Sequence, residues 1–150
     1  MQRSIINYQP ITPLLLLVGL ILYESITSIY VYITPLAGYI FLYIVENFQN
    51  KEKKWIIGSL FLYLAYFELD RGFFIFSSLL LFLFYYRYVH EELKATIACK
   101  ICLKITIIII YYLGFYLLNL LFALLFNYDL PKLDISYIVF IISDIAVVLL

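Results

Sequence analysis

The densest group of ionisable residues within the apolar part of this sequence lies at positions 68–72. Glu68, Asp70 and Arg71 follow one another closely and precede Gly72. Glu68 and Arg71 are three residues apart, so on a helix they would share one face and could form an ion pair. Gly72 permits the positive φ angle of a tight turn between helices. The segment therefore predicts either a partner-binding turn or a charged cap between two short helices.

Three further polar residues stand in apolar surroundings. For Asp144, one interpretation is a proton or cation relay or a contact to another helix. The other is a hydrogen bond to a nearby Ser or Tyr, such as Ser143. Glu24 is expected at a membrane interface. Asn119 is expected to join helices rather than to bind substrate, because uncharged polar side chains often bond across helices in lipid.

The pair Cys99-x-x-Cys102 has a spacing that is typical of redox or zinc sites in other settings. The chain has no second such pair, and His90 is its only histidine. We therefore predict no metal site and expect the cysteines to pack on an apolar helix face. His90, beside Glu91 and Glu92, is expected at a solvated helix end.

The sequence also lacks the common catalytic signatures. It contains no phosphate-binding loop, no serine-hydrolase elbow and no zinc-protease motif. We predict no catalytic residues, no cofactor and no enzyme activity.

The composition places these residues in a membrane protein. Hydrophobic residues make up 66% of the 150 residues and charged residues 13%, against roughly 45–50% and 25% in soluble domains. These values exclude a soluble monomer and a disordered chain. Zero net charge without a basic run argues against a nucleic-acid partner. We expect one polytopic domain over residues 1–150 in membrane lipid, with the first apolar stretch retained rather than cleaved as a signal peptide.

Six apolar stretches predict an all-α integral membrane bundle of about six transmembrane helices. Residues 105–126 are long enough to cross a membrane on their own. Residues 55–67 and 72–86 are short, and each must extend into the segment between them or into its cytoplasmic flank. Residues 135–150 almost suffice for the last span. Gly38 and Gly58 are each expected to allow a close approach of helices.

The first apolar region, residues 4–45, is too long for one crossing and predicts two helices. We expect the second to run from Pro35 to Phe48, with Thr34 as its N-cap and Pro35 at its first helical position. Residues 24–33 would then form an interfacial connection. The alternative is a second helix that starts near Ile29 and kinks at Pro35.

Basic residues alternate between the loops, and eight of the ten fall on one side. This pattern predicts that both termini are cytoplasmic. Residues 88–104 place Leu93, Ile97 and Ile101 at helical spacing between lysines. They predict an amphipathic helix at the membrane face that leads into the fifth span, or a simple extension of that span.

Residues 34–87 resemble the MreD family of rod-shape-determining bacterial membrane proteins. Pro35 matches the proline at the head of the family's second helix, and Gly58 matches a glycine early in its third. Residues 65–72, AYFELDRG, match its turn, with Glu68 at the acidic position and Gly72 at the glycine. The resemblance implies a bundle similar to the substrate-binding subunits (S-components) of ECF vitamin transporters.

The resemblance also implies a function. The chain would be a non-catalytic scaffold of the cell-elongation machinery in the bacterial inner membrane, where peptidoglycan is built. Its partners would be an MreC-like scaffold protein and cell-wall synthases. Two alternatives stay open: a substrate-binding subunit of an uptake transporter, and a carrier coupled to a proton or ion through Asp144.

Overall fold

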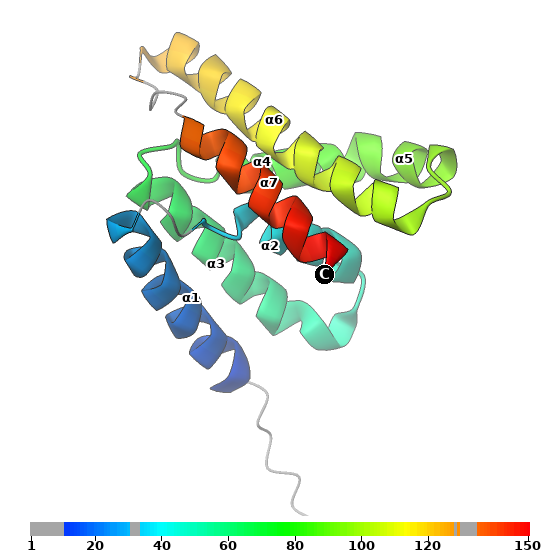
Figure 1. Cartoon of the computed structure of the whole chain (residues 1–150), viewed down its shortest axis with the longest axis horizontal. Helices are drawn as coiled ribbons and strands as arrows, with labels where there is room; N and C mark the ends of the chain where they lie inside the picture. The colour runs from blue at the N-terminus through cyan, green and yellow to red at the C-terminus, as the bar shows by residue number, and fades with distance from the viewer. Residues whose placement is uncertain (1–10, 31–33, 128, 130–134) are drawn as a thin grey trace, which may run out of the picture.

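The computed structural model describes residues 11–30, 34–127, 129 and 135–150, and every regular element in these ranges is a helix (Figure 1). The elements are α1 (Ile11–Ile29), α2 (Ala37–Asn47), a 3-10 turn (Lys51–Lys53), α3 (Lys54–Asp70), α4 (Ser77–Phe84), a π-helical turn (Tyr85–Val89), α5 (His90–Thr96), α6 (Lys100–Phe126) and α7 (Ile135–Leu149). The all-α expectation is confirmed. The expectations for residues 1–10, 31–33 and 130–134 lie outside the described residues.

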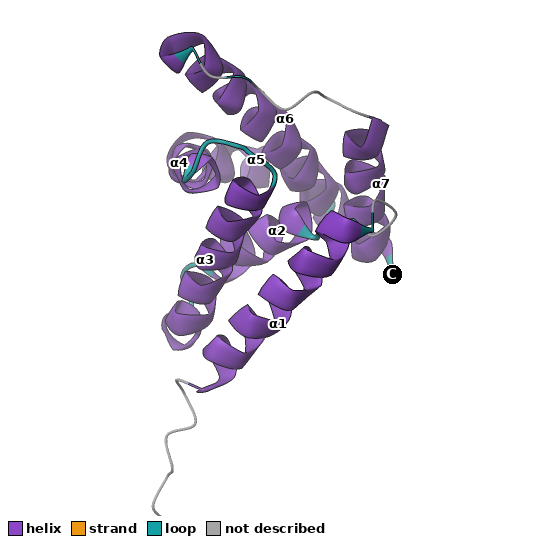
Figure 2. Cartoon of the chain, turned by 90° about the vertical axis from the view of Figure 1, so that its left-hand side faces the viewer, coloured by secondary structure: helices purple, strands orange, loops and turns teal. Residues whose placement is uncertain are grey.

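Helix α2 forms the centre of the bundle. It contacts α3, α6 and α7, while α1 packs along α3 at the edge (Figures 1 and 2). Most residues of α2 between Ala37 and Val45 are themselves buried, on nearly every side of the helix, as expected for an apolar helix enclosed by others. The Phe41 ring lies 4.6 Å from that of Tyr111 and 6.1 Å from that of Phe82, measured between centroids. This aromatic cluster fixes α2 against α4 and α6.

Among the described residues, two helices have the length and apolar composition needed to cross a membrane: α1 with 19 residues and α6 with 27. Large apolar side chains on both face outward, among them Leu15 and Leu22 on α1 and Leu117 and Leu124 on α6. These features support membrane association. The count of six spans stays a prediction.

The short third and fourth stretches both extend as expected, the third into the segment between them and the fourth beyond its C-terminal end. α3 continues to Asp70, as predicted. The fourth helix begins at Ser77 rather than near residue 72, because the chain makes a turn between α3 and α4 that includes Gly72 and Phe76, both with positive φ. It then continues through the π-helical turn into α5. The amphipathic segment therefore extends the fourth helix, and extended backbone at Ile97 and Cys99 separates it from α6.

Both expectations for the start of the second helix are wrong. α2 begins at Ala37, two residues after Pro35, and its N-cap position is Leu36, whose side chain makes no capping bond. The carbonyl of Thr34 accepts a hydrogen bond from the hydroxyl of Tyr23 at 2.8 Å. Residues 24–29 belong to α1 and not to an interfacial connection. The donors at the start of α2 are satisfied from a distant part of the chain, as described below.

Candidate functional site

Three carboxylates of the described residues lie in the interior of the bundle with no exposed surface: Glu24, Glu68 and Asp144. Carboxylates are almost never fully buried unless they are paired or hydrogen-bonded, because removing them from water is costly. Each of the three must therefore have an environment that offsets this cost. They come from α1, α3 and α7, and we take them together as the candidate site.

Glu68, in the last turn of α3, caps the start of α4. Its Oε2 accepts the backbone N–H of Phe76 at 2.6 Å. Its Oε1 accepts the N–H of Ser78 at 2.5 Å and the hydroxyl of Ser77 at 2.9 Å. A negative charge at this position also interacts favourably with the helix dipole. The expected ion pair with Arg71 is wrong, and the alternative of a charged cap between two helices matches the geometry.

Asn119 holds the same turn from α6. Its Oδ1 accepts the N–H of Phe74 at 2.9 Å, and its Nδ2 donates to the hydroxyl of Ser77 at 3.2 Å. Gly72 has a φ of 70°, as the turn required. The expectation that Asn119 joins helices is confirmed, since it connects α6 to the turn between α3 and α4.

Asp144 caps the start of α2 from the other end of the sequence. Its Oδ2 accepts the N–H groups of Gly38 at 2.8 Å and Tyr39 at 3.2 Å, and the hydroxyl of Tyr112 at 2.7 Å. The hydrogen-bond interpretation of Asp144 therefore describes its contacts, but Ser143 is not the partner, because its hydroxyl donates to the carbonyl of Phe140. The Oδ1 atom is buried and has no hydrogen-bond partner among the described residues.

Gly38 makes this cap possible. A Cβ atom built on it would lie 2.6 Å from Oδ2 of Asp144 and 2.7 Å from Cε2 of Tyr112. Any larger residue would push α7 or α6 away from α2. The expected close approach at Gly38 is confirmed. The one at Gly58 is wrong, since a Cβ atom there would meet nothing within 4 Å.

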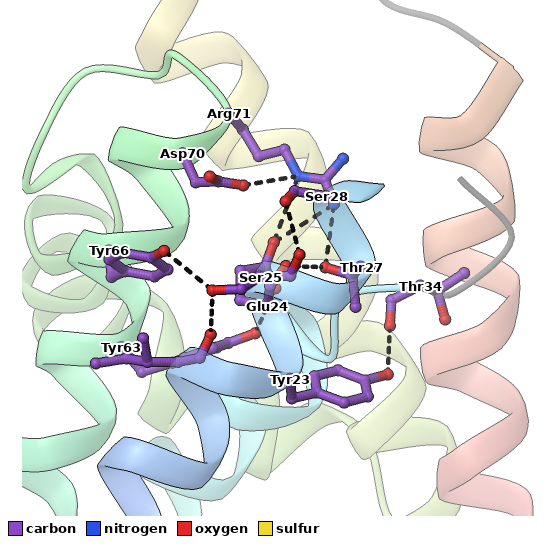
Figure 3. Close-up of polar contacts among 11 residues, drawn as sticks. Tyr23, Glu24, Ser25, Thr27, Ser28, Thr34, Tyr63, Tyr66, Asp70 and Arg71 are labelled. Carbon is purple, nitrogen blue, oxygen red and sulfur yellow. Dashed lines mark hydrogen bonds and ion pairs between the residues drawn. The ribbon is translucent and has the colours of Figure 1, made fainter. Parts of the chain in front are cut away.

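Glu24 is buried against α3, because α1 packs along α3 (Figure 3), and its expected position at a membrane interface stays a prediction. The hydroxyl of Tyr63 donates to its Oε2 at 2.9 Å. The guanidinium of Arg71 bonds to its Oε1 through Nε and Nη2, both at 3.4 Å. Arg71 also donates to the hydroxyl of Thr27 at 3.3 Å.

Two more contacts complete the surroundings of Arg71. Its Nε lies 4.0 Å from Oδ2 of Asp70. Its guanidinium lies 5.6 Å from the ring centroid of Phe140 on α7, within the range of a cation–π interaction. Arg71 therefore joins α1, the end of α3 and α7.

The three carboxylates bond to groups of the chain itself. Glu24 joins α1 to α3, Glu68 joins α3 to α4, and Asp144 joins α7 to α2 and α6. Glu68 and Asp144 accept the free N–H groups at a helix start. These groups need hydrogen-bond partners wherever a helix begins away from water. Within the described residues, no group of three His, Cys, Asp or Glu side chains is arranged to hold a metal ion.

Several participants were not predicted from the sequence. Ser77 and Ser78 precede the apolar run of α4, which is a recognisable helix-start pattern. Nothing in the sequence distinguishes Tyr63 and Tyr112 from the other tyrosines.

The expectations for His90 and the two cysteines are wrong. His90 directly follows the π-helical turn, is buried and stacks on Tyr86, with 5.1 Å between ring centroids. Cys99 and Cys102 are exposed rather than packed. They lie at the start of α6, directly after the extended backbone that separates α5 from α6.

Comparison of this chain with protein-family models, with curated protein sequences and with solved structures finds no match. The functional interpretation therefore rests on the residues of the chain.

Proposed function

We propose that this chain is a non-catalytic, multi-pass scaffold protein of the bacterial inner membrane that serves the cell-elongation machinery. The observation that carries the proposal is that all three buried carboxylates bond to helices of the same chain. Polar groups are thus used to hold the helices in one arrangement. A scaffold needs such a fixed shape, because its outer surface must present the same contacts to its partners at all times.

The lysines that gather at one end of the bundle support the proposal of six spans with both termini in the cytoplasm. At one end, Lys104 at the start of α6 pairs with Glu46 of α2 at 3.4 Å. The lysines of residues 51–54 follow α2 at the same end (Figure 1). At the other end, Phe74 stacks on Phe126 near the end of α6. The lysine-rich end would face the cytoplasm.

The alternative of a substrate-binding subunit is less well supported. A pocket for a vitamin-like solute needs several polar groups that converge on the ligand. The buried polar groups Glu68, Asn119 and Asp144 instead bond to backbone N–H groups. A cavity of about 370 Å³ between α1 and α3 is lined mainly by apolar residues, such as Leu17, Trp55 and Leu62. Such a surface suits a lipid chain or another helix better than a polar solute.

The resemblance of residues 34–87 to the MreD family supplies the specific role. In this proposal the partners are an MreC-like scaffold protein and peptidoglycan synthases. Glu68 and Gly72 form the turn that the resemblance highlights, and the turn is held rigidly by Glu68 and Asn119.

Depletion of the protein in its host tests the proposal. The expected result is loss of elongated cell shape and of fluorescent D-amino acid incorporation along the side wall. Re-expression of the wild type should restore both, and so should Gly58→Ala, which changes a position without close contacts. Normal shape and normal incorporation in depleted cells would contradict the scaffold role.

A carrier coupled to protons or ions is the second candidate, and Oδ1 of Asp144 is the observation that favours it. A buried carboxylate oxygen without a partner is an available site for a proton. The test is Asp144→Asn in proteoliposomes that enclose a pH-sensitive dye. A carrier would lose its proton flux with normal protein levels. A scaffold would show no flux in either form, and the variant would support normal cell shape.

A further inference from the structure

Two exposed cysteines begin α6, and neither has a role in the bundle described above. Cys99 occupies the N-cap position, and its Sγ accepts the backbone N–H of Cys102 at 3.4 Å. Both thiols are accessible from outside the chain. The backbone at Cys99 is extended, with φ of −80° and ψ of 117°, as is usual for an N-cap residue.

The spacing brings the two sulfur atoms within reach of each other. Residues three apart at a helix start lie on the same face. Their Cα atoms are then about 5–6 Å apart, which is the separation that a disulfide spans. The Sγ of Cys99 lies 3.4 Å from the backbone nitrogen of Cys102, whose N–H it accepts. Because the Sγ of Cys99 already lies against the residue that carries the second thiol, little movement is needed for the two sulfur atoms to bond.

The surroundings of Cys99 favour its thiolate form. The hydrogen bond from the Cys102 thiol lowers the pKa of Cys99, and the backbone N–H of Cys102 lowers it further. The free N–H groups and the dipole at a helix start act in the same direction. The thiolate is the form that attacks disulfides. Cys99 is therefore the attacking thiol, and Cys102 is placed to follow it.

We propose that Cys99 and Cys102 form a thiol–disulfide exchange site at the start of α6, which reacts with a low-molecular-weight disulfide such as oxidised glutathione. The Cys99 thiolate attacks one sulfur of that disulfide, forming a mixed disulfide and releasing one thiolate. The Cys102 thiol gives its proton to solvent and attacks Cys99, releasing the second thiolate. One disulfide forms and one breaks, and the chain loses two electrons to the oxidant. This site is independent of the scaffold proposal.

The test uses the full-length protein in detergent, equilibrated in glutathione buffers that range from fully reduced to fully oxidised. Samples are quenched with acid, alkylated with N-ethylmaleimide, and measured as intact protein by mass spectrometry. The expected result is the loss of both maleimide adducts, together with a mass two hydrogens lower and no bound glutathione. Two adducts retained in fully oxidised glutathione would overturn the proposal.

Two single variants assign the roles. Cys102→Ser should accumulate a mixed disulfide with glutathione at Cys99, because the second thiol is missing. Cys99→Ser should react more slowly, because Cys102 has the weaker thiolate character. Equal reaction of the two variants would overturn the assignment of Cys99 as the attacking thiol. Because both residues are exposed, both variants should fold like the wild type. Elution in a single peak at the wild-type volume in size-exclusion chromatography is the control.

Discussion

α2 and α4 both begin inside the bundle at a buried carboxylate, yet the two carboxylates are used differently. Glu68 lies eight to ten residues before the groups it accepts, and both of its oxygens are occupied. Asp144 lies 105 and 106 residues after Tyr39 and Gly38, and Oδ2 accepts the bonds described above while Oδ1 has no partner in the part of the chain that the structure describes. The Glu68 cap is local and uses both carboxylate oxygens. The Asp144 cap is remote in sequence and uses one.

This difference separates two tasks that a buried acid can perform. The local cap shapes a turn, and its donors come from the same turn. The remote cap joins the last helix to the second, so α2 can begin correctly only when α7 is in place. When both oxygens of a carboxylate accept hydrogen bonds, replacement by an amide places its NH₂ group against another donor. When one oxygen accepts none, the NH₂ group of the amide can take that position without facing a donor.

The largest effect is expected for Glu68→Gln. Either orientation of the new amide places its NH₂ group against a backbone N–H, of Phe76 or of Ser78. The free energy of unfolding should fall by about 3 kcal/mol, from one lost charged cap and one unpaired donor. The measurement is the midpoint of thermal unfolding in detergent. A midpoint equal to that of the wild type would remove the distinction between the two caps.

Arg71→Met extends the comparison to Glu24, the third buried acid. The substitution removes the positive charge that pairs with Glu24. The expected loss is about 2 kcal/mol, less than for a fully buried pair, because the Arg71 side chain is 25% exposed and water screens it. Adding Glu24→Gln should recover most of the loss, since no charge then remains buried. Unfolding midpoints of the single and double variants measure this, and additive losses would contradict the pairing.

Gly38→Ala tests the closeness of the remote cap. The added methyl group would overlap Asp144 and Tyr112, and the overlap should outweigh the gain in helix propensity. We expect a net loss of about 1–2 kcal/mol in the free energy of unfolding. Unfolding in denaturant gives the value, and an increase in stability would mean that α7 does not approach α2 this closely.

Asp144→Asn should cost only about 1 kcal/mol, chiefly the lost charge at the helix start. The amide oxygen can replace Oδ2, and the NH₂ group takes the position of the unpaired Oδ1. The informative quantity is the difference from Glu68→Gln, measured in the same detergent. A loss as large as that of Glu68→Gln would show that Oδ1 has an important partner.

Gly58→Ala is the matched control for Gly38→Ala and the smallest effect. Its methyl group would meet nothing within 4 Å, and the position is inside α3. Stability should rise by about 0.5–1 kcal/mol from helix propensity alone. A decrease in the unfolding midpoint would reveal a contact of Gly58 that the bundle does not account for.

The sequence was sufficient wherever the interaction is local. The composition predicted an all-helical chain, and the spacing at residues 68–72 predicted the turn. The glycine at position 72 predicted the positive φ that the turn has there. The extension of α3 to Asp70 followed from the shortness of its apolar stretch. Glu68 as a cap was among the alternatives, because its donors lie only a few residues away.

The sequence was insufficient wherever the partner is remote. Thr34 was the natural local choice to cap the second helix, yet Asp144 does so from α7. Arg71 has an acid three residues before it, yet it binds Glu24 because α1 packs along α3. Periodicity identifies which face of a helix is apolar but does not state which helix lies against it.

Hydrogen exchange at the starts of α2 and α4, followed by mass spectrometry, is the most direct test of the claim that buried carboxylates hold these helices in place. The variants are Asp144→Ala and Glu68→Ala. Asp144→Ala should speed exchange at Gly38 and Tyr39 and leave Phe76 and Ser78 unchanged, whereas Glu68→Ala should do the reverse. Unchanged exchange at Gly38 and Tyr39 after the loss of Asp144 would contradict the account.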